Sequence, residues 1–289
     1  MNKKNTVTLL TLGIIALSFI AAITGILSSQ GSGPYSYETI RGDIIEIYGR
    51  GLYRHMKSDI AIQGIAHDYV TLFIGIPLLI LGLRGYRKDS LKGSFILTGT
   101  LGFFLLTYLF YLMMAMYNEL FLIYVALLGF SFFSFVLMLG SFDKDSIKEK
   151  FSENTKVKVP GIFLVINGIN VGILWLTMVI TPLLDGSIYP VDIGHSTTLV
   201  VQGLDLALML PFSIITGILL IKRNPLGYIF APSYLIFLSI LMAALTAKLI
   251  AMGMAGVSII PAIIIMPATM LISIGCVVSL MKNIKSNVM

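Results

Sequence analysis

The chain has 289 residues, of which 57% are hydrophobic and 12% are charged, and its formal net charge is +6. Soluble domains are about 25% charged, so this chain has too little charge to cover a globular surface with polar groups. The composition excludes a soluble enzyme, a nucleic-acid-binding protein and a disordered chain, and it predicts an all-α polytopic membrane protein.

Eight segments are predicted to be transmembrane helices, because each supplies about 20 mostly apolar residues, enough to cross about 30 Å of hydrocarbon. The first follows Lys3 and Lys4, but its apolar core is longer than the roughly 7–15 residues of a signal peptide, so a retained anchor is expected. The second helix spans only if His67 and Asp68 enter the membrane, and the sixth contains Asp205. The predicted cores lie near residues 7–27, 60–83, 94–116, 120–139, 161–180, 197–221, 226–247 and 259–281.

The loop after the first helix, residues 28–59, is long enough to hold structure of its own. Two β-prone runs flank Arg41-Gly42-Asp43 and predict a small hairpin. An isolated hairpin is marginally stable in water, so we expect this one to rest on the end of the helix bundle. The Arg-Gly-Asp string is interpreted as turn chemistry rather than as an adhesion motif.

The other long loop, residues 141–160, is rich in charged and small polar residues and is predicted to be a solvated linker between two halves, residues 1–140 and 161–289. The stretches from Pro77 to Gly93 and from Pro211 to Gly227 align without a gap and share proline, isoleucine, lysine and glycine positions. Parallel repeats of this kind occur in transporters, and we expect two parallel repeats of four helices.

The distribution of lysine and arginine predicts both termini in the cytoplasm, because short cytoplasmic loops carry an excess of these residues. In that orientation 15 of the 20 lysines and arginines lie on the cytoplasmic side, and the other five are Arg41, Arg50, Arg54, Lys57 and Lys248. The predicted location is therefore the cell membrane, crossed several times.

Four strings support a resemblance: His67-Asp-Tyr-Val-Thr-Leu-Phe-Ile-Gly-Ile-Pro77, Tyr117-Asn-Glu-Leu-Phe-Leu-Ile-Tyr-Val-Ala126, Leu204-Asp-Leu-Ala-Leu-Met-Leu-Pro211 and Lys222-Arg-Asn-Pro-Leu-Gly-Tyr228. Over about residues 38–252 the chain resembles a family of multi-pass bacterial cell-membrane proteins with no assigned activity. The resemblance implies a prokaryotic membrane protein and supplies no reaction, substrate or partner.

Two acidic residues are the leading candidates for a binding site, because ionisable groups at membrane depth are costly and tend to face the interior. Asp68 lies 16 residues from Arg84 and Asp205 lies 17 from Lys222, about 24 and 26 Å along a helix. We expect the two carboxylates at matched depth in one polar cavity between the second and sixth helices. Further candidates are His67, Gln202 and Glu119, with Gln63, Asn167, Asn170 and Lys248 as neighbours.

Two interpretations of these residues remain open. In the first, the site binds or permeates a small solute or ion. In the second, the aspartates only stabilise helix ends or helix contacts, and the protein is a non-transporting subunit or sensor that meets a membrane or extracytoplasmic partner. The expected surroundings are lipid, and nucleic acid is not expected. With a single cysteine, Cys276, and without a phosphate-binding loop or a metalloprotease or hydrolase motif, no catalytic residue, metal or cofactor is predicted.

Overall fold

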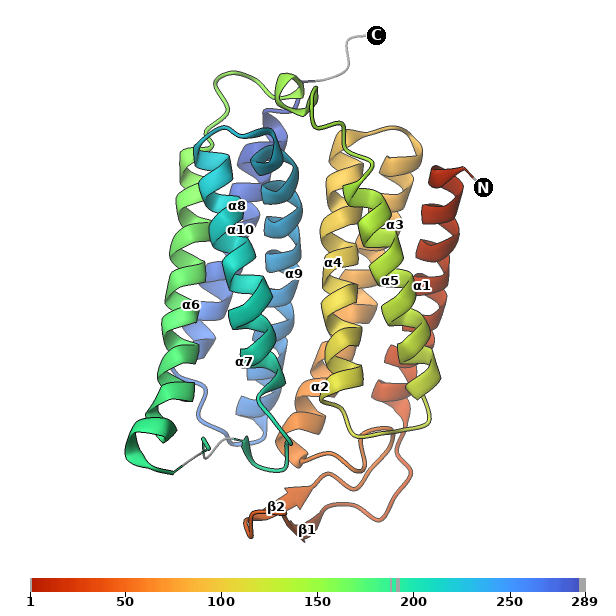
Figure 1. Cartoon of the computed structure of the whole chain (residues 1–289). Coiled ribbons are helices and arrows are strands. Elements are labelled where there is room, and N and C mark those ends of the chain that lie inside the picture. The colour runs from red at the N-terminus through yellow and green to blue at the C-terminus, as the bar shows by residue number, and fades with distance from the viewer. Residues whose placement is uncertain (1, 188, 191–192, 286–289) are drawn as a thin grey trace.

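The computed structural model describes residues 2–187, 189–190 and 193–285 and is built almost entirely of helices (Figure 1). In these residues eight helices are long and apolar enough to cross a membrane, which confirms the predicted all-α multi-pass architecture. The first half contains α1 (Lys3–Leu27), β1 (Tyr35–Glu38), β2 (Ile44–Ile47), α2 (Ser58–Val70), η1 (Thr71–Gly75), α3 (Ile76–Arg87), α4 (Leu91–Met113) and α5 (Phe121–Leu139). The rest contains η2 (Ile147–Lys150), α6 (Lys158–Asp185), α7 (Val200–Leu204), η4 (Asp205–Met209), α8 (Leu210–Ile221), α9 (Pro225–Met254) and α10 (Ala262–Lys282).

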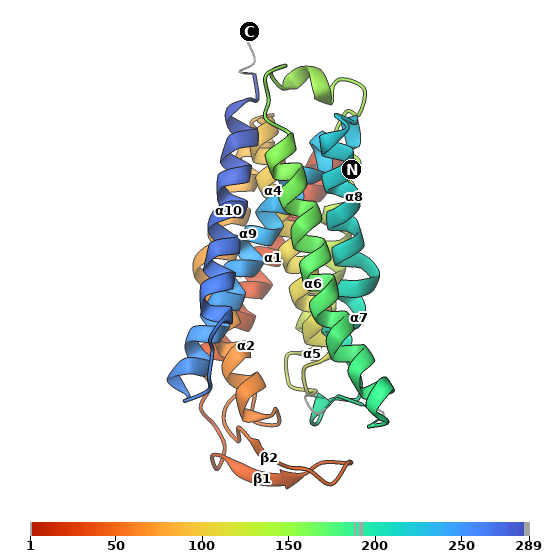
Figure 2. The same cartoon turned by 90° about the vertical axis from the view of Figure 1, so that its left-hand side faces the viewer.

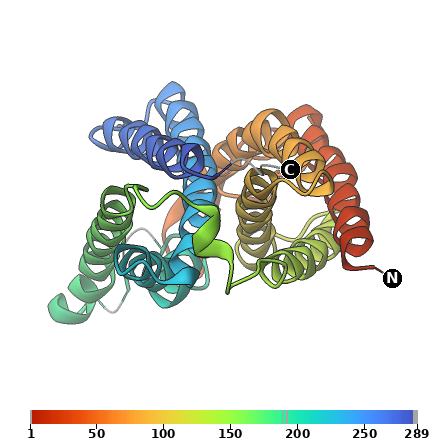
Figure 3. The same ribbon diagram turned by 90° about the horizontal axis from the view of Figure 1, so that it is seen from above.

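The helices form two lobes that meet along α4 and α9. The first lobe comprises α1–α5 and the second comprises α6–α10, and α4 packs directly against α9 between them (Figure 3). The start of α1 and the end of α10 lie at one end of the molecule and the β1–β2 hairpin lies at the other (Figures 1 and 2). We refer to these as the terminal end and the hairpin end.

Each lobe contains one spanning helix that is interrupted by a wider π-helical turn. These turns, η1 and η4, begin at Thr71 and Asp205, and the prolines that follow are Pro77 and Pro211. Asp205 follows Thr71 by 134 positions, and Pro211 follows Pro77 by the same number. Proline donates no N–H to the carbonyl four residues earlier, and in both helices that carbonyl belongs to the π-helical turn. The same local chemistry therefore produces the same break in each lobe.

The turn that follows is also repeated at the level of the backbone. Asp89 and Arg223, again 134 positions apart, both adopt the left-handed conformation, with φ of 57° and 53°. The next residues, Ser90 and Asn224, both cap the following helix through their side chains. The α3–α4 and α8–α9 hairpins therefore indicate an internal repeat whose backbone is better preserved than its sequence.

One contact places the axis that relates the lobes. A Cβ atom on Gly99 of α4 would lie 2.5 Å from the carbonyl oxygen of Ser233 on α9, and residues 99 and 233 also differ by 134. Helices that run in the same direction and touch at equivalent residues are related by a two-fold axis parallel to them. The lobes thus have the symmetry of a parallel repeat, with the axis along α4 and α9.

The predicted hairpin is present. Strands β1 and β2 pair antiparallel with Tyr35 opposite Ile47, and the Arg-Gly-Asp string forms their turn, in which the Gly42 N–H donates to the Thr39 carbonyl at 3.0 Å. After β2 the chain returns to the first lobe through residues 48–57, which we call the return segment. It contributes Leu52, Tyr53 and Met56 to a small core that also holds Ala61.

Part of the predicted solvated linker is packed against both lobes. Ile147 and Phe151 are buried, and the Phe151 ring contacts Phe95 of α4 and Tyr228 of α9. The expectation of a fully solvated linker was wrong here because these two apolar side chains interrupt the charged run and cover the terminal end of the α4–α9 contact.

Candidate functional site

Asp68 lies inside the first lobe with both carboxylate oxygens occupied. The residue is 4% exposed, and the Tyr53 hydroxyl donates to Oδ2 at 2.6 Å while the Tyr111 hydroxyl donates to Oδ1 at 2.9 Å. The two hydroxyl oxygens are 3.1 Å apart. Hydrogen bonds to a charged group contribute about 1.5–3 kcal/mol each, so Tyr53, Asp68 and Tyr111 form a fixed unit, which we call the Asp68 cluster.

Helix α1 closes the cluster from the remaining side. Gly25 packs so closely that a Cβ atom at this position would overlap Oδ2 of Asp68 and lie 2.9 Å from its Cγ. Gly25 also continues a buried stripe on α1 at seven-residue intervals with Thr11 and Ser18. Small residues on that stripe let α1 approach the carboxylate.

The return segment holds Tyr53 in place from the hairpin end. Gly51 has φ of 58°, a conformation that favours glycine, and its N–H donates to the Gln30 carbonyl at 2.7 Å. The Leu52 N–H donates to Ser28 Oγ at 2.7 Å. Burial first, and then the neighbouring Asp68 charge, raises the pKa of Tyr53 well above its ordinary value, so the hydroxyl stays a neutral donor.

His67 is next to Asp68 in sequence but has its own partners on α4. Its ring is buried, Nε2 lies 3.0 Å from Thr107 Oγ1, and the ring stacks on Phe103. Phe103, Thr107 and Tyr111 are four residues apart and so share one face of α4. That face therefore receives both His67 and Asp68.

Asp205 and Gln202 belong to a different environment in the second lobe. Trp175 of α6 donates its indole N–H to Asp205 Oδ2 at 2.9 Å, and the Gln202 amide contacts Met178 Sδ at 3.5 Å. Asp205 is only partly buried. No hydrogen bond joins it to Asp68 in the part of the chain that the structure describes.

The expectation of one cavity shared by the two aspartates is therefore replaced by two separate polar sites. Equivalent positions on equivalent helices leave open which neighbour each helix face meets. In each lobe the acidic face meets that lobe's own first helix, at Gly25 of α1 and Trp175 of α6. Asp68 and Asp205 thus each point toward partners in their own lobe.

Glu119 lies at the surface of the hairpin end, outside the Asp68 cluster. It forms an ion pair with Arg54 of the return segment, and its side chain is 57% exposed. A hydrogen bond to its own backbone N–H, and then the Arg54 guanidinium, lowers the pKa of Glu119. Exposed pairs of this kind contribute little to stability, so its predicted place in a ligand site has no contact to support it. Of the other suggested neighbours, Asn167 is partly buried and Asn170 is exposed on α6.

A small cavity at the hairpin end is lined by Tyr111 of the Asp68 cluster. Its volume is about 90 Å³, room for a few water molecules, and far below the roughly 300–1,000 Å³ of pockets for drug-sized ligands. The Tyr124 hydroxyl at this cavity is buried without a partner among the described residues. Its lining residues are Tyr111, Leu112, Ala115, Met116, Tyr117, Asn118, Phe121 and Tyr124.

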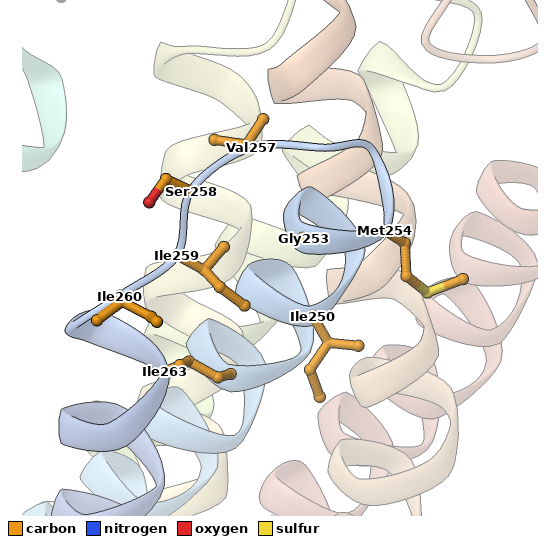
Figure 4. Close-up of a pocket in the computed structure, with 8 residues that line it drawn as sticks. All are labelled: Ile250, Gly253, Met254, Val257, Ser258, Ile259, Ile260 and Ile263. Atoms are coloured by element: carbon orange, nitrogen blue, oxygen red, sulfur yellow. The ribbon is translucent and has the colours of Figure 1, made fainter.

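A second, wider depression lies at the bend between α9 and α10 (Figure 4). It is lined by Ile250, Gly253, Met254, Val257, Ser258, Ile259, Ile260 and Ile263. Ser258 is the only side chain of this lining that carries a polar group. The lining suits acyl chains or another apolar surface better than an ion.

Sequence reasoning missed Tyr53, Tyr111 and Gly25. Tyrosines and phenylalanines near helix ends are typical of an interfacial belt, yet Tyr108, Tyr111 and Tyr124 form an aromatic cluster beside Asp68. The seven-residue spacing of Thr11, Ser18 and Gly25 was the one available signal of a close helix approach.

Replacing Tyr53 by phenylalanine is expected to lower the free energy of unfolding by about 1.5–3 kcal/mol, because one oxygen of a buried carboxylate loses its donor while the ring packing stays. Thermal unfolding of the purified protein in nanodiscs measures the change. Tyr48→Phe is the matched control, since no hydrogen bond of the Tyr48 hydroxyl is present in the described residues. Equal stability of the two variants would contradict the assignment of Tyr53 as an essential donor.

Comparison of the chain with protein-family models, curated proteins and solved structures finds no match in any of the three.

Proposed function

We propose that the protein is a cell-membrane protein, with both termini in the cytoplasm, that binds a small monovalent cation at Asp68 from the hairpin side. The excess of lysine and arginine at the terminal end supports the orientation. The hairpin end then faces outward, and the cavity beside Tyr111 supplies the approach.

The observation that carries the proposal is a buried carboxylate without a counter-ion. No lysine, arginine or histidine lies within 4 Å of Asp68 in an ion pair among the described residues, and its direct donors are neutral hydroxyls. An uncompensated charge at this depth is costly. A cation removes that cost, and one carboxylate matches a single positive charge.

Size and chemistry favour an inorganic cation over an organic solute. Carboxylate and hydroxyl oxygens are ligands that hard cations prefer, and the cluster presents both kinds within one hydrogen-bonded unit. The approach of about 90 Å³ admits a cation with some of its water but is too small for a sugar.

The test is the stability of the nanodisc-embedded protein as Na⁺ or K⁺ is added, with an impermeant organic cation keeping the ionic strength constant. Ligand at 100 times its Kd stabilises the folded state by about 2.7 kcal/mol, so wild type is expected to gain that much with one of the two ions. Asp68→Asn is expected to gain nothing, while Asp205→Asn, the matched control, responds like wild type. An unresponsive wild type, or a response that survives in Asp68→Asn, would refute the proposal.

One observation favours the second candidate, a sensor or subunit that meets a protein partner. At the exposed end of the β1–β2 hairpin Ile40 and Ile44 are 79% and 77% exposed, beyond the helical spans. If Asp68→Asn leaves cation response and stability unchanged while Ile40→Ser with Ile44→Ser abolishes co-purification of a partner, this second function replaces the first.

A further inference from the structure

Lys248 is a basic residue near the hairpin end of α9 that has no partner in the described structure. It lies on α9, 23 residues from Pro225, or about 35 Å along the helix. It follows Phe237, Leu241 and Ala244 at spacings that keep all four on one helix face, and a Cβ atom on Gly102 of α4 would lie 3.8 Å from the Phe237 ring. The stripe therefore faces the first lobe, and Lys248 forms neither a hydrogen bond nor an ion pair with a described residue.

The helix register brings the Lys248 ammonium to the level of the Asp68 cluster. The Gly99–Ser233 contact aligns α4 with α9, so Lys248 is level with Met114, three residues or about 4.5 Å beyond Tyr111. Helical side chains lean toward the N-terminus of their own helix, which carries the ammonium back toward Tyr111. Helix α2, which holds Asp68, also packs on α9, so the Lys248 stem lies on the helix that α2 contacts.

The internal repeat offers a comparison within the same chain. The position equivalent to Asp68 is Gln202, and the position equivalent to Lys248 is Met114, each displaced by 134. The pair Asp68 and Lys248 thus has an acid on the first lobe and a base on the second. The symmetry-related pair, Gln202 and Met114, has two neutral residues. Both charges are present together in one place and absent together in the other, which links Lys248 to Asp68.

We propose that Lys248 is an intramolecular counter-cation that exchanges between the unpaired position described here and a contact with Asp68, and that a bound cation competes with this contact. A carboxylate has about four acceptor positions, so the ammonium can join the tyrosine hydroxyls without displacing them. The flexible four-carbon stem of lysine permits both positions. This inference rests on the proposed function, because it assigns to Lys248 the control of the cation site.

The test is cation binding by Lys248→Met, which installs the residue of the symmetry-related place. Removing a competitor is expected to tighten the apparent Kd for Na⁺ or K⁺ at least tenfold in nanodiscs, measured by the shift of thermal unfolding with ion concentration. Lys248→Arg is expected to keep the affinity near that of wild type, and Lys222→Met at the terminal end serves as control. Unchanged or weaker binding by Lys248→Met would overturn the proposal.

A double-mutant cycle separates failure of this inference from failure of the proposed function. Without added Na⁺ or K⁺, Asp68→Gln and Lys248→Met are each expected to lower the unfolding temperature. The double variant, which copies the neutral Gln202 and Met114 place, should be more stable than the sum of the two losses predicts. If the variants at positions 68 and 248 are coupled but wild type binds no cation, only the proposed function is refuted. If the stability losses of the two single variants simply add, the pairing of Lys248 with Asp68 is refuted.

Discussion

Replacing Gly25 by alanine is expected to disrupt the Asp68 cluster and to lower the free energy of unfolding. The new Cβ would overlap Asp68 Oδ2 and lie 3.0 Å from the Tyr53 hydroxyl oxygen. Overpacking costs about 1–3 kcal/mol, and loss of a hydrogen bond to a buried carboxylate adds about 1.5–3 kcal/mol. Thermal unfolding in nanodiscs and the stabilisation by Na⁺ or K⁺ should both fall.

Gly129→Ala on α5 is the matched control, because a Cβ atom there would meet nothing within 4 Å. In a helix that substitution is expected to stabilise by about 0.5–1 kcal/mol. Combining Gly25→Ala with Asp68→Ala removes the overlapping atoms and should recover part of the stability. A Gly25→Ala protein as stable as Gly129→Ala, or a double variant without recovery, would show that α1 does not press on the carboxylate.

The sequence was sufficient to predict the helices and the burial of Asp68, because both depend on chain length, apolar runs and charge. It was not sufficient to predict the partners of Asp68. Tyr53 reaches it only through the path of the return segment, which depends on the left-handed backbone of Gly51 and the contact with Ser28. Similarly, the pairing of Asp205 with Trp175 depends on how two helices rotate about their own axes, which spacing alone leaves open.

The internal repeat is likewise difficult to predict from residue identities. Asp89 and Arg223 are chemically opposite, yet they share one unusual backbone conformation at equivalent positions. Sequence comparison finds only a weak match there, while backbone geometry identifies the repeat. The repeats differ at the pair Asp68 and Lys248, which correspond to Gln202 and Met114, and the proposed cation site depends on that difference.

Replacing Gly99 by alanine is expected to separate α4 from α9 and so to weaken both the fold and the coupling of Lys248 to Asp68. The added Cβ would lie 2.5 Å from the Ser233 carbonyl oxygen and 2.7 Å from Ile236 Cβ. Because backbone and a β-branched side chain can yield little, the cost should reach the upper part of the roughly 1–3 kcal/mol range for overpacking. The unfolding temperature and the double-mutant coupling, both measured in nanodiscs, report the two effects.

Gly102→Ala is the control on the same helix, since its Cβ would make only ordinary contacts, the nearest with the Phe135 ring at 3.4 Å. It should match or exceed wild-type stability and leave the coupling between positions 68 and 248 intact. If Gly99→Ala instead behaved like Gly102→Ala, then α4 and α9 could move apart at little cost. The contact of equivalent residues would then not hold the lobes in register, and Lys248 would have no fixed level from which to reach Asp68.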